Sequence, residues 1–288
     1  MAADNHTLDP TVSLQAAGLV DGDHLAAIVL EAKLVTEGTT FALFCSGGDR
    51  VVTWGNPKEG GDSSEVQDRL TGVQEIQATT SAFAAVLADG SLVTWGDAES
   101  GGDSSEVQAQ LINVQQVQST GRAFAALLAA GSVVTWGDPD CGGDSSEVRD
   151  QLRNVRQVQA TERAFAAILA DGSVVTWGAS TFGGNSSSVR HQLRNVRHIS
   201  STAAAFAATL VDHTVVSWGL PDSGGDSTAV QAQLRNVEQI AGTRNAFAAI
   251  LANGKVVTWG SPKCGGDSSR VQDHLEDVQQ ICGTGAEI

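Results

Sequence analysis

Short apolar runs separated by turn residues recur along most of the chain. Residues 83–88 are FAAVLA and fit the two-residue period of a β-strand, and a second apolar run follows at 91–95 (SLVTW). Asp89-Gly90 lies between the two runs. This arrangement predicts a β-hairpin with a type I′ turn, because glycine adopts a positive φ without a steric cost. Residues 73–78 predict a further strand, so each unit supplies at least three antiparallel strands.

The pattern is an internal repeat of 41 residues. A Trp-Gly pair marks each unit, a Gly-Gly pair begins six residues after each tryptophan, and a phenylalanine opens each hairpin. One unit cannot bury both faces of its own sheet, whereas units stacked around an axis can. We therefore predict an all-β fold, a six-bladed β-propeller over 34–288, with an open β-solenoid or a seven-bladed closure as alternatives. The expected core between blades contains Trp54, Trp95, Trp136, Trp177, Trp218 and Trp259.

The segment between each tryptophan and the next unit has a different spacing. Val66, Leu70 and Val73 lie at i, i+4 and i+7, and Asp62 precedes Glu65 by three residues, as in a capping box. This pattern predicts a short helix, with a fourth outer strand as the alternative.

Closure of the ring can be predicted in two ways. Segments equivalent to 73–78 recur through 278–282, and a weaker copy lies at 33–37, which gives seven first strands for six hairpins. The favoured closure pairs 278–282 with the hairpin that begins at Phe41, and the alternative places 33–37 in the first blade. In a six-bladed ring Cys141 and Cys264 lie on opposite sides, beyond the ~7 Å Cα separation of a disulfide. We expect all four cysteines to be free thiols, as in a reducing compartment.

Each repeat has an apolar strand that ends in Trp-Gly and a glycine six residues after the tryptophan, as in 170–184 (ADGSVVTWGASTFGG). In these features the repeat resembles the RCC1-like family (regulator of chromosome condensation). The resemblance covers 34–288 and implies a propeller. The chain differs from the family at Ala82 and its equivalents, where the family has histidine, and in a Gly-Gly-Asp-Ser turn that replaces Gly-Gln-Leu-Gly. Residues 7–35 resemble the C-terminal part of a ubiquitin-like fold, so we expect 1–33 to be an extension.

Composition restricts the function. The chain has 17 Lys and Arg and 33 Asp and Glu, a net charge of -16, which argues against binding of nucleic acid or of an anionic membrane. No run of about 18 apolar residues could span a bilayer, and residues 1–20 do not resemble a signal peptide, so we expect an intracellular protein, cytoplasmic or nuclear. No Cys-x-x-Cys or His-x-x-x-His pair predicts a metal site, and the Gly55–Gly60 spacing lacks the Lys-Ser/Thr of a nucleotide loop. We therefore expect no catalytic residue, metal or cofactor.

Positions that differ between repeats are the best candidates for binding, because packing explains the shared ones. They lie in two loops, one after each Trp-Gly and one before each phenylalanine, and Phe182 is the one large apolar residue in the first set. The leading hypothesis is a monomeric, non-enzymatic scaffold that binds a protein partner, and the acidic charge favours a basic one. The alternatives are a propeller lectin that stacks tryptophan on sugars and, by family resemblance, a guanine-nucleotide exchange or ubiquitin-ligase accessory module. The candidate partner-binding residues are Glu59, Asp97, Glu99, Arg122, Asp140, Glu162, Arg163, Phe182, Asp222, Arg244, Asn245 and Lys263.

Overall fold

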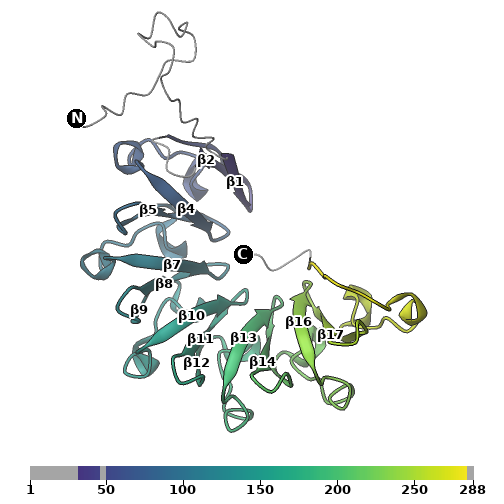
Figure 1. Cartoon of the computed structure of the whole chain (residues 1–288). Coiled ribbons are helices and arrows are strands. Elements are labelled where there is room, and N and C mark those ends of the chain that lie inside the picture. Colours follow the sequence, from purple (N-terminus) through teal and green to yellow (C-terminus); the bar gives the residue numbers. More distant parts are fainter. Residues whose placement is uncertain (1–31, 46–49, 284–288) are drawn as a thin grey trace, which may run out of the picture. The chain divides into compact units, whose positions relative to one another are not determined.

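The computed structural model describes residues 32–45 and 50–283, which form six three-stranded antiparallel sheets (Figure 1). Each sheet is one blade and corresponds to one repeat. The strands are, in blades 1 to 6, β1 (Ala32–Glu37), β2 (Thr40–Cys45), β3 (Val51–Gly55); β4 (Val73–Ala78), β5 (Ala82–Leu87), β6 (Leu92–Gly96); β7 (Val114–Ser119), β8 (Ala123–Leu128), β9 (Val133–Gly137); β10 (Val155–Ala160), β11 (Ala164–Leu169), β12 (Val174–Gly178); β13 (Val196–Ser201), β14 (Ala205–Leu210), β15 (Val215–Gly219); β16 (Val237–Gly242), β17 (Ala246–Leu251), β18 (Val256–Gly260).

The first strands of successive blades lie side by side, from β1 next to β4 through to β13 next to β16 (Figure 1). In every blade the middle strand pairs with both of its neighbours along the chain. Each repeat therefore folds into one local sheet, and packing between sheets joins the repeats.

The hairpins are confirmed, but the predicted turn type is wrong. The N–H of Gly90 donates to the carbonyl of Leu87, and Gly90 has a φ of 76°. Asp89 does not have a positive φ, whereas a type I′ turn requires two such residues. The carboxylate of Asp89 instead accepts the N–H of Ser91 at 2.9 Å. The connection is therefore one residue longer than predicted and ends in a glycine bulge.

In place of the predicted short helices, four repeats have a single 3-10 turn and blades 4 and 5 have only turns, and the alternative outer strand does not form in the described residues. The carboxylate of Asp62 accepts the N–H of Ser64 at 3.0 Å, and this hydrogen bond lowers the pKa of Asp62. Leu70 is fully buried, so the apolar spacing anchors an irregular segment on the blade. The 3-10 turns are η1 (Pro57–Glu59), η2 (Gln67–Arg69), η3 (Ala98–Ser100), η4 (Gln108–Gln110), η5 (Pro139–Cys141), η6 (Ser146–Val148), η7 (Ser180–Phe182), η8 (Pro221–Ser223), η9 (Pro262–Cys264) and η10 (Gln272–His274).

The core lies between successive blades. Alanines of β8 in blade 3 share an apolar cluster with Val158, Phe165 and Trp177 of blade 4. Phe165 and Trp177 stack with 5.2 Å between ring centroids, and the indole N–H of Trp177 donates to the carbonyl of Gly142 at 3.1 Å. The small alanines allow the sheets to approach, so that one aromatic pair fills each space. The same arrangement recurs at Trp95, Trp136, Trp218 and Trp259, all of them buried.

Trp54 departs from the predicted core. It stacks on Phe41 like its equivalents, yet 43% of it is exposed. The reason is that the other tryptophans are covered by the preceding blade, and no described residues precede blade 1.

The favoured closure of the ring is also wrong. β1 pairs with β2, with Thr36 opposite Phe41, so 33–37 takes the place that 278–282 was expected to fill. The C-terminal segment 278–283 forms no strand, and the N–H of Val278 donates to the carbonyl of Gly254. The predicted ubiquitin-like extension lies, up to residue 31, outside the described residues.

Replacing Ser119 with alanine should stabilise the protein. Ser119 is fully buried, and its hydroxyl has no hydrogen-bond partner among the described residues. An unpaired buried hydroxyl costs about 1–3 kcal/mol, so we expect Ser119→Ala to raise the free energy of unfolding by about 1 kcal/mol. Ser200→Ala is the control, because its hydroxyl donates to the carbonyl of Ile240 at 3.0 Å and its loss should destabilise. Urea denaturation measures both, and a destabilised Ser119→Ala would contradict the prediction.

Candidate functional site

The two variable loops of each blade lie against each other at one end of the sheet. In blade 3 the hydroxyl of Thr120, at the start of the loop before β8, donates to the carbonyl of Cys141 in the loop after β9 at 3.0 Å. A threonine makes the same bond in five blades, at 2.9–3.0 Å, and the five are Thr79, Thr120, Thr161, Thr202 and Thr243. These tethers bring the variable positions of blades 2 to 6 to one surface, which we call the variable-loop face.

Backbone hydrogen bonds join the loops of neighbouring blades. The N–H of Thr80 donates to the carbonyl of Gly121, and the N–H of Gly121 donates to that of Glu162. In the same way the N–H of Glu162 donates to the carbonyl of Ala203, and the N–H of Ala203 donates to that of Arg244. The donor–acceptor distances of these four bonds are 2.8–3.0 Å. Five blades therefore hold their loops in one connected row that does not depend on the side chains.

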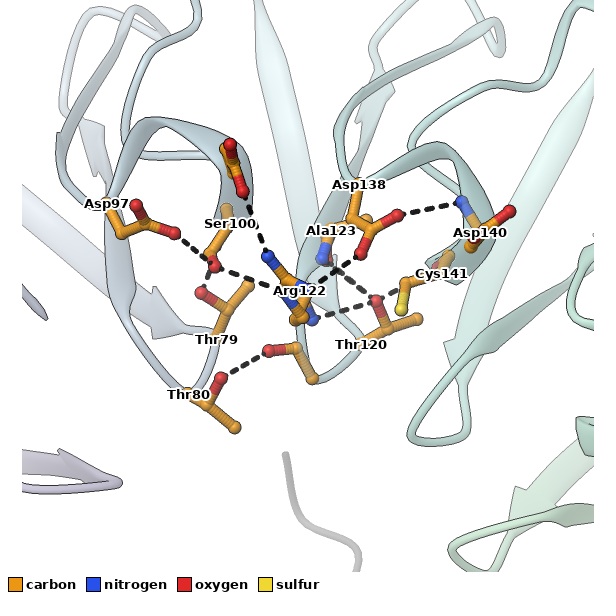
Figure 2. A network of polar contacts seen from close by, with 12 residues as sticks. Thr79, Thr80, Asp97, Ser100, Thr120, Arg122, Ala123, Asp138, Asp140 and Cys141 are labelled. Carbon is orange, nitrogen blue, oxygen red and sulfur yellow. Dashed lines mark hydrogen bonds and ion pairs between the residues drawn. The ribbon is translucent and has the colours of Figure 1, made fainter.

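Arg122 bridges two blades on this face (Figure 2). Its guanidinium lies 3.2 Å from the carboxylate of Asp138 in its own blade and 3.5 Å from that of Glu99 in blade 2. It also donates to the hydroxyl of Ser100 at 3.4 Å, and Ser100 in turn donates to Asp97 at 2.6 Å. Asp138 is the more enclosed acid, since its side chain is 17% exposed against 86% for Glu99.

Arg163 occupies the equivalent place in blade 4 with different contacts. Its guanidinium carbon lies 5.6 Å from the centroid of the Phe182 ring, in a cation–π contact. Burial raises the pKa of the Cys141 thiol, and a hydrogen bond from Arg163 opposes that shift. Phe182 is therefore a half-buried apolar residue with a cation over one of its faces.

Further contacts extend the face toward blades 5 and 6. Arg244 lies 3.8 Å from Glu162, and the hydroxyl of Ser223 donates to Asn245 at 3.3 Å. Asp222 and Lys263 have no polar side-chain contact among the described residues.

The structure brings the two variable loops of a repeat together, whereas the sequence identified these loops only by the positions that differ between repeats. Two features of this face were not predicted from the sequence. Asp138 lies within a predicted loop but was not named as a candidate. The threonine tethers were also missed, although a threonine that recurs every 41 residues marks them in the sequence. The partner of Arg122 could not be predicted, because it depends on how adjacent loops meet.

In the described part of the chain, no group of three or more His, Cys, Asp or Glu side chains is arranged to hold a metal ion. None of the helices in residues 32–45 and 50–283 is long and apolar enough to cross a membrane. All four cysteines are free.

Six repeated three-stranded blades define the chain as a β-propeller. No family model and no curated protein sequence matches it. Among solved structures it is similar to human WBSCR16, with 15% identity and a TM-score of 0.54 over 90% of this chain and 86% of that one. It is also similar to yeast RCC1 (Prp20) bound to Kap60, with 16% identity and a TM-score of 0.50 over 85% of this chain and 73% of that one. The fold is therefore that of an RCC1-like repeat propeller.

Proposed function

We propose that the protein is a non-enzymatic scaffold that binds a protein partner on its variable-loop face. The observation that carries the proposal is the separation of roles within each loop. The threonine tethers and the backbone row fix the loops, while the side chains that differ between repeats project from them. One solved RCC1-like propeller of similar fold is bound to another protein, Kap60, which is consistent with this role.

The charges of the face favour a basic partner. Of the twelve candidate residues six are acidic and four are basic. Arg122 is neutralised by Asp138 and Glu99, and Arg244 lies near Glu162. The excess of acidic over basic side chains, together with the net charge of -16, would attract a basic surface over long range.

The lectin alternative has less support. Stacking on sugars needs exposed aromatic rings, but five of the six tryptophans are 3–5% exposed and donate their indole N–H groups to backbone carbonyls. These five side chains serve the packing between blades.

Charge reversal on the face should weaken partner binding. Asp140 and Asp222 are exposed and their carboxylates make no hydrogen bond among the described residues, so Asp140→Lys with Asp222→Lys should leave the fold intact. We expect this double variant to bind the partner at least about tenfold more weakly, because each reversed charge repels a basic surface. The matched control, Glu106→Lys with Glu147→Lys, makes the same charge change at exposed positions of the outer segments and should bind normally.

The measurement begins with chemical cross-linking and mass spectrometry on the full chain, followed by titration of the purified partner at two salt concentrations. Equal binding by both double variants would refute the variable-loop face as the site. Accelerated nucleotide exchange on a GTPase, abolished by one loop substitution, would overturn the non-enzymatic function.

A further inference from the structure

The first blade has an apolar face that every later blade buries. This leading face consists of Leu34, Phe41, Leu43, Val52 and Trp54. Four of these residues are 38–53% exposed, and Phe41 is half-buried. Their equivalents in blade 2 are Ile76, Phe83, Ala85, Val93 and Trp95, and all five are 0–5% exposed. The leading face thus has the composition of an interface between blades, and no blade within residues 32–45 and 50–283 covers it.

The last blade carries the complementary half. In blades 1 to 5 the first glycine of the Gly-Gly pair packs under the phenylalanine of the next blade, and a Cβ at Gly142 would lie 2.7 Å from the ring of Phe165. The carbonyl of that glycine accepts the indole N–H of the next blade's tryptophan. Gly265 of blade 6 has the same left-handed φ, 100°, but no atom lies within 4 Å of the corresponding position. Its surface therefore lacks an aromatic pair, which is what Phe41 and Trp54 would provide.

The C-terminal segment 278–283 lies in the place of the next first strand. Gln239 donates to the carbonyl of Ile281, 42 residues on, as Gln116 donates to that of Val158. Yet 278–283 pairs with no strand, and Val278 and Ile281 are half-buried where most of their equivalents are buried. Because Leu34 of β1 is the equivalent of Ile281, a first blade that docked here would need the same place.

We propose that the leading face of a second copy of this chain binds the Gly265 turn and displaces 278–283, so that copies associate head to tail. The first blade packs on β4, and no comparable packing joins it to β16, β17 or β18 of its own chain. The two surfaces are the halves of an interface that the chain already forms five times. A heterologous contact of this kind extends beyond a dimer unless it closes. The proposal replaces the monomer expected from the sequence.

A cross-link between defined positions tests the proposal. Arg163 contacts Cys141 between blades 4 and 3, and the equivalents of these residues are Thr39 in blade 1 and Cys264 in blade 6. We expect a Thr39→Cys variant of the full chain, treated with a short bismaleimide, to give covalently linked pairs of molecules. The link should disappear when Cys264→Ser is added. A link from the new thiol to Cys264 found only within single molecules would show that the chain closes on itself and would overturn the proposal.

Sedimentation velocity over a range of concentrations gives an independent test. Deletion of 278–288 should strengthen self-association by about tenfold, because the competing segment is gone. Trp54→Ala should weaken self-association by about tenfold or more, as expected for an aromatic residue at the centre of an interface. Ile112→Ser is the control, because Ile112 is also an exposed apolar residue but lies away from the leading face. A chain that stays monomeric at every concentration, with or without 278–288, would refute the proposal.

Discussion

Phe165→Ala is expected to lower the free energy of unfolding by about 3–5 kcal/mol, the cost of removing a large buried aromatic side chain. The ring is fully buried, stacks on Trp177 and covers Gly142 of the preceding blade. Its removal leaves a cavity between two sheets that are held together mainly by such contacts. Chemical denaturation followed by far-UV circular dichroism measures the change.

Phe41→Ala is the matched control, since Phe41 occupies the same position in blade 1. It stacks on Trp54 with 5.0 Å between ring centroids, but no blade among the described residues precedes it and packs on the ring. We expect less than half the loss measured for Phe165→Ala. Equal losses would mean that the aromatic pair stabilises its own hairpin, rather than the contact between blades.

Gly142→Ala is the second substitution with a large expected effect. Gly142 has a φ of 92°, which costs an alanine about 1–3 kcal/mol, and the added Cβ would lie 2.7 Å from the ring of Phe165. Crowding in a packed core adds a further loss of about 1–3 kcal/mol. Together, the backbone strain and the crowding make Gly142→Ala one of the single-methyl additions that should lower the free energy of unfolding most.

Gly265→Ala separates the two causes. Its φ of 100° imposes the same backbone strain, but the space around its Cβ position is empty. The difference in unfolding free energy between Gly142→Ala and Gly265→Ala therefore measures the steric contact alone. If both variants lose the same stability, packing of Phe165 on Gly142 contributes little.

The sequence predicted the parts of the fold that depend on one repeat and missed those that depend on how repeats meet. The hairpins and first strands follow from alternation within 41 residues. The conformation of Asp89 could not be predicted from Asp-Gly alone, because the same pair also forms a longer connection with a bulge. Trp54 was placed in the core because it has the same neighbours in the sequence as Trp95, yet burial depends on a preceding blade.

The candidate site shows the same division. Variable positions selected two loops of each repeat as candidates for binding, and the structure places those two loops together. The first strand of blade 1 could not be predicted in the same way. Residues 33–37 and 278–282 both match the repeat, and periodicity alone does not show which of the two pairs with the hairpin at Phe41. The contact of Arg122 with Asp138 likewise depends on loop geometry that no spacing encodes.

The row of main-chain bonds from Thr80 to Arg244 has a consequence for how such a protein could diversify. Amide and carbonyl groups are common to nearly all residues, so substitutions at the loop tips leave the supports unchanged. Recognition can therefore drift or be re-engineered one blade at a time, with little loss of folding stability. A library randomised at 121–122, 162–163 and 244–245, none of which is buried, would explore new specificities on an unaltered framework.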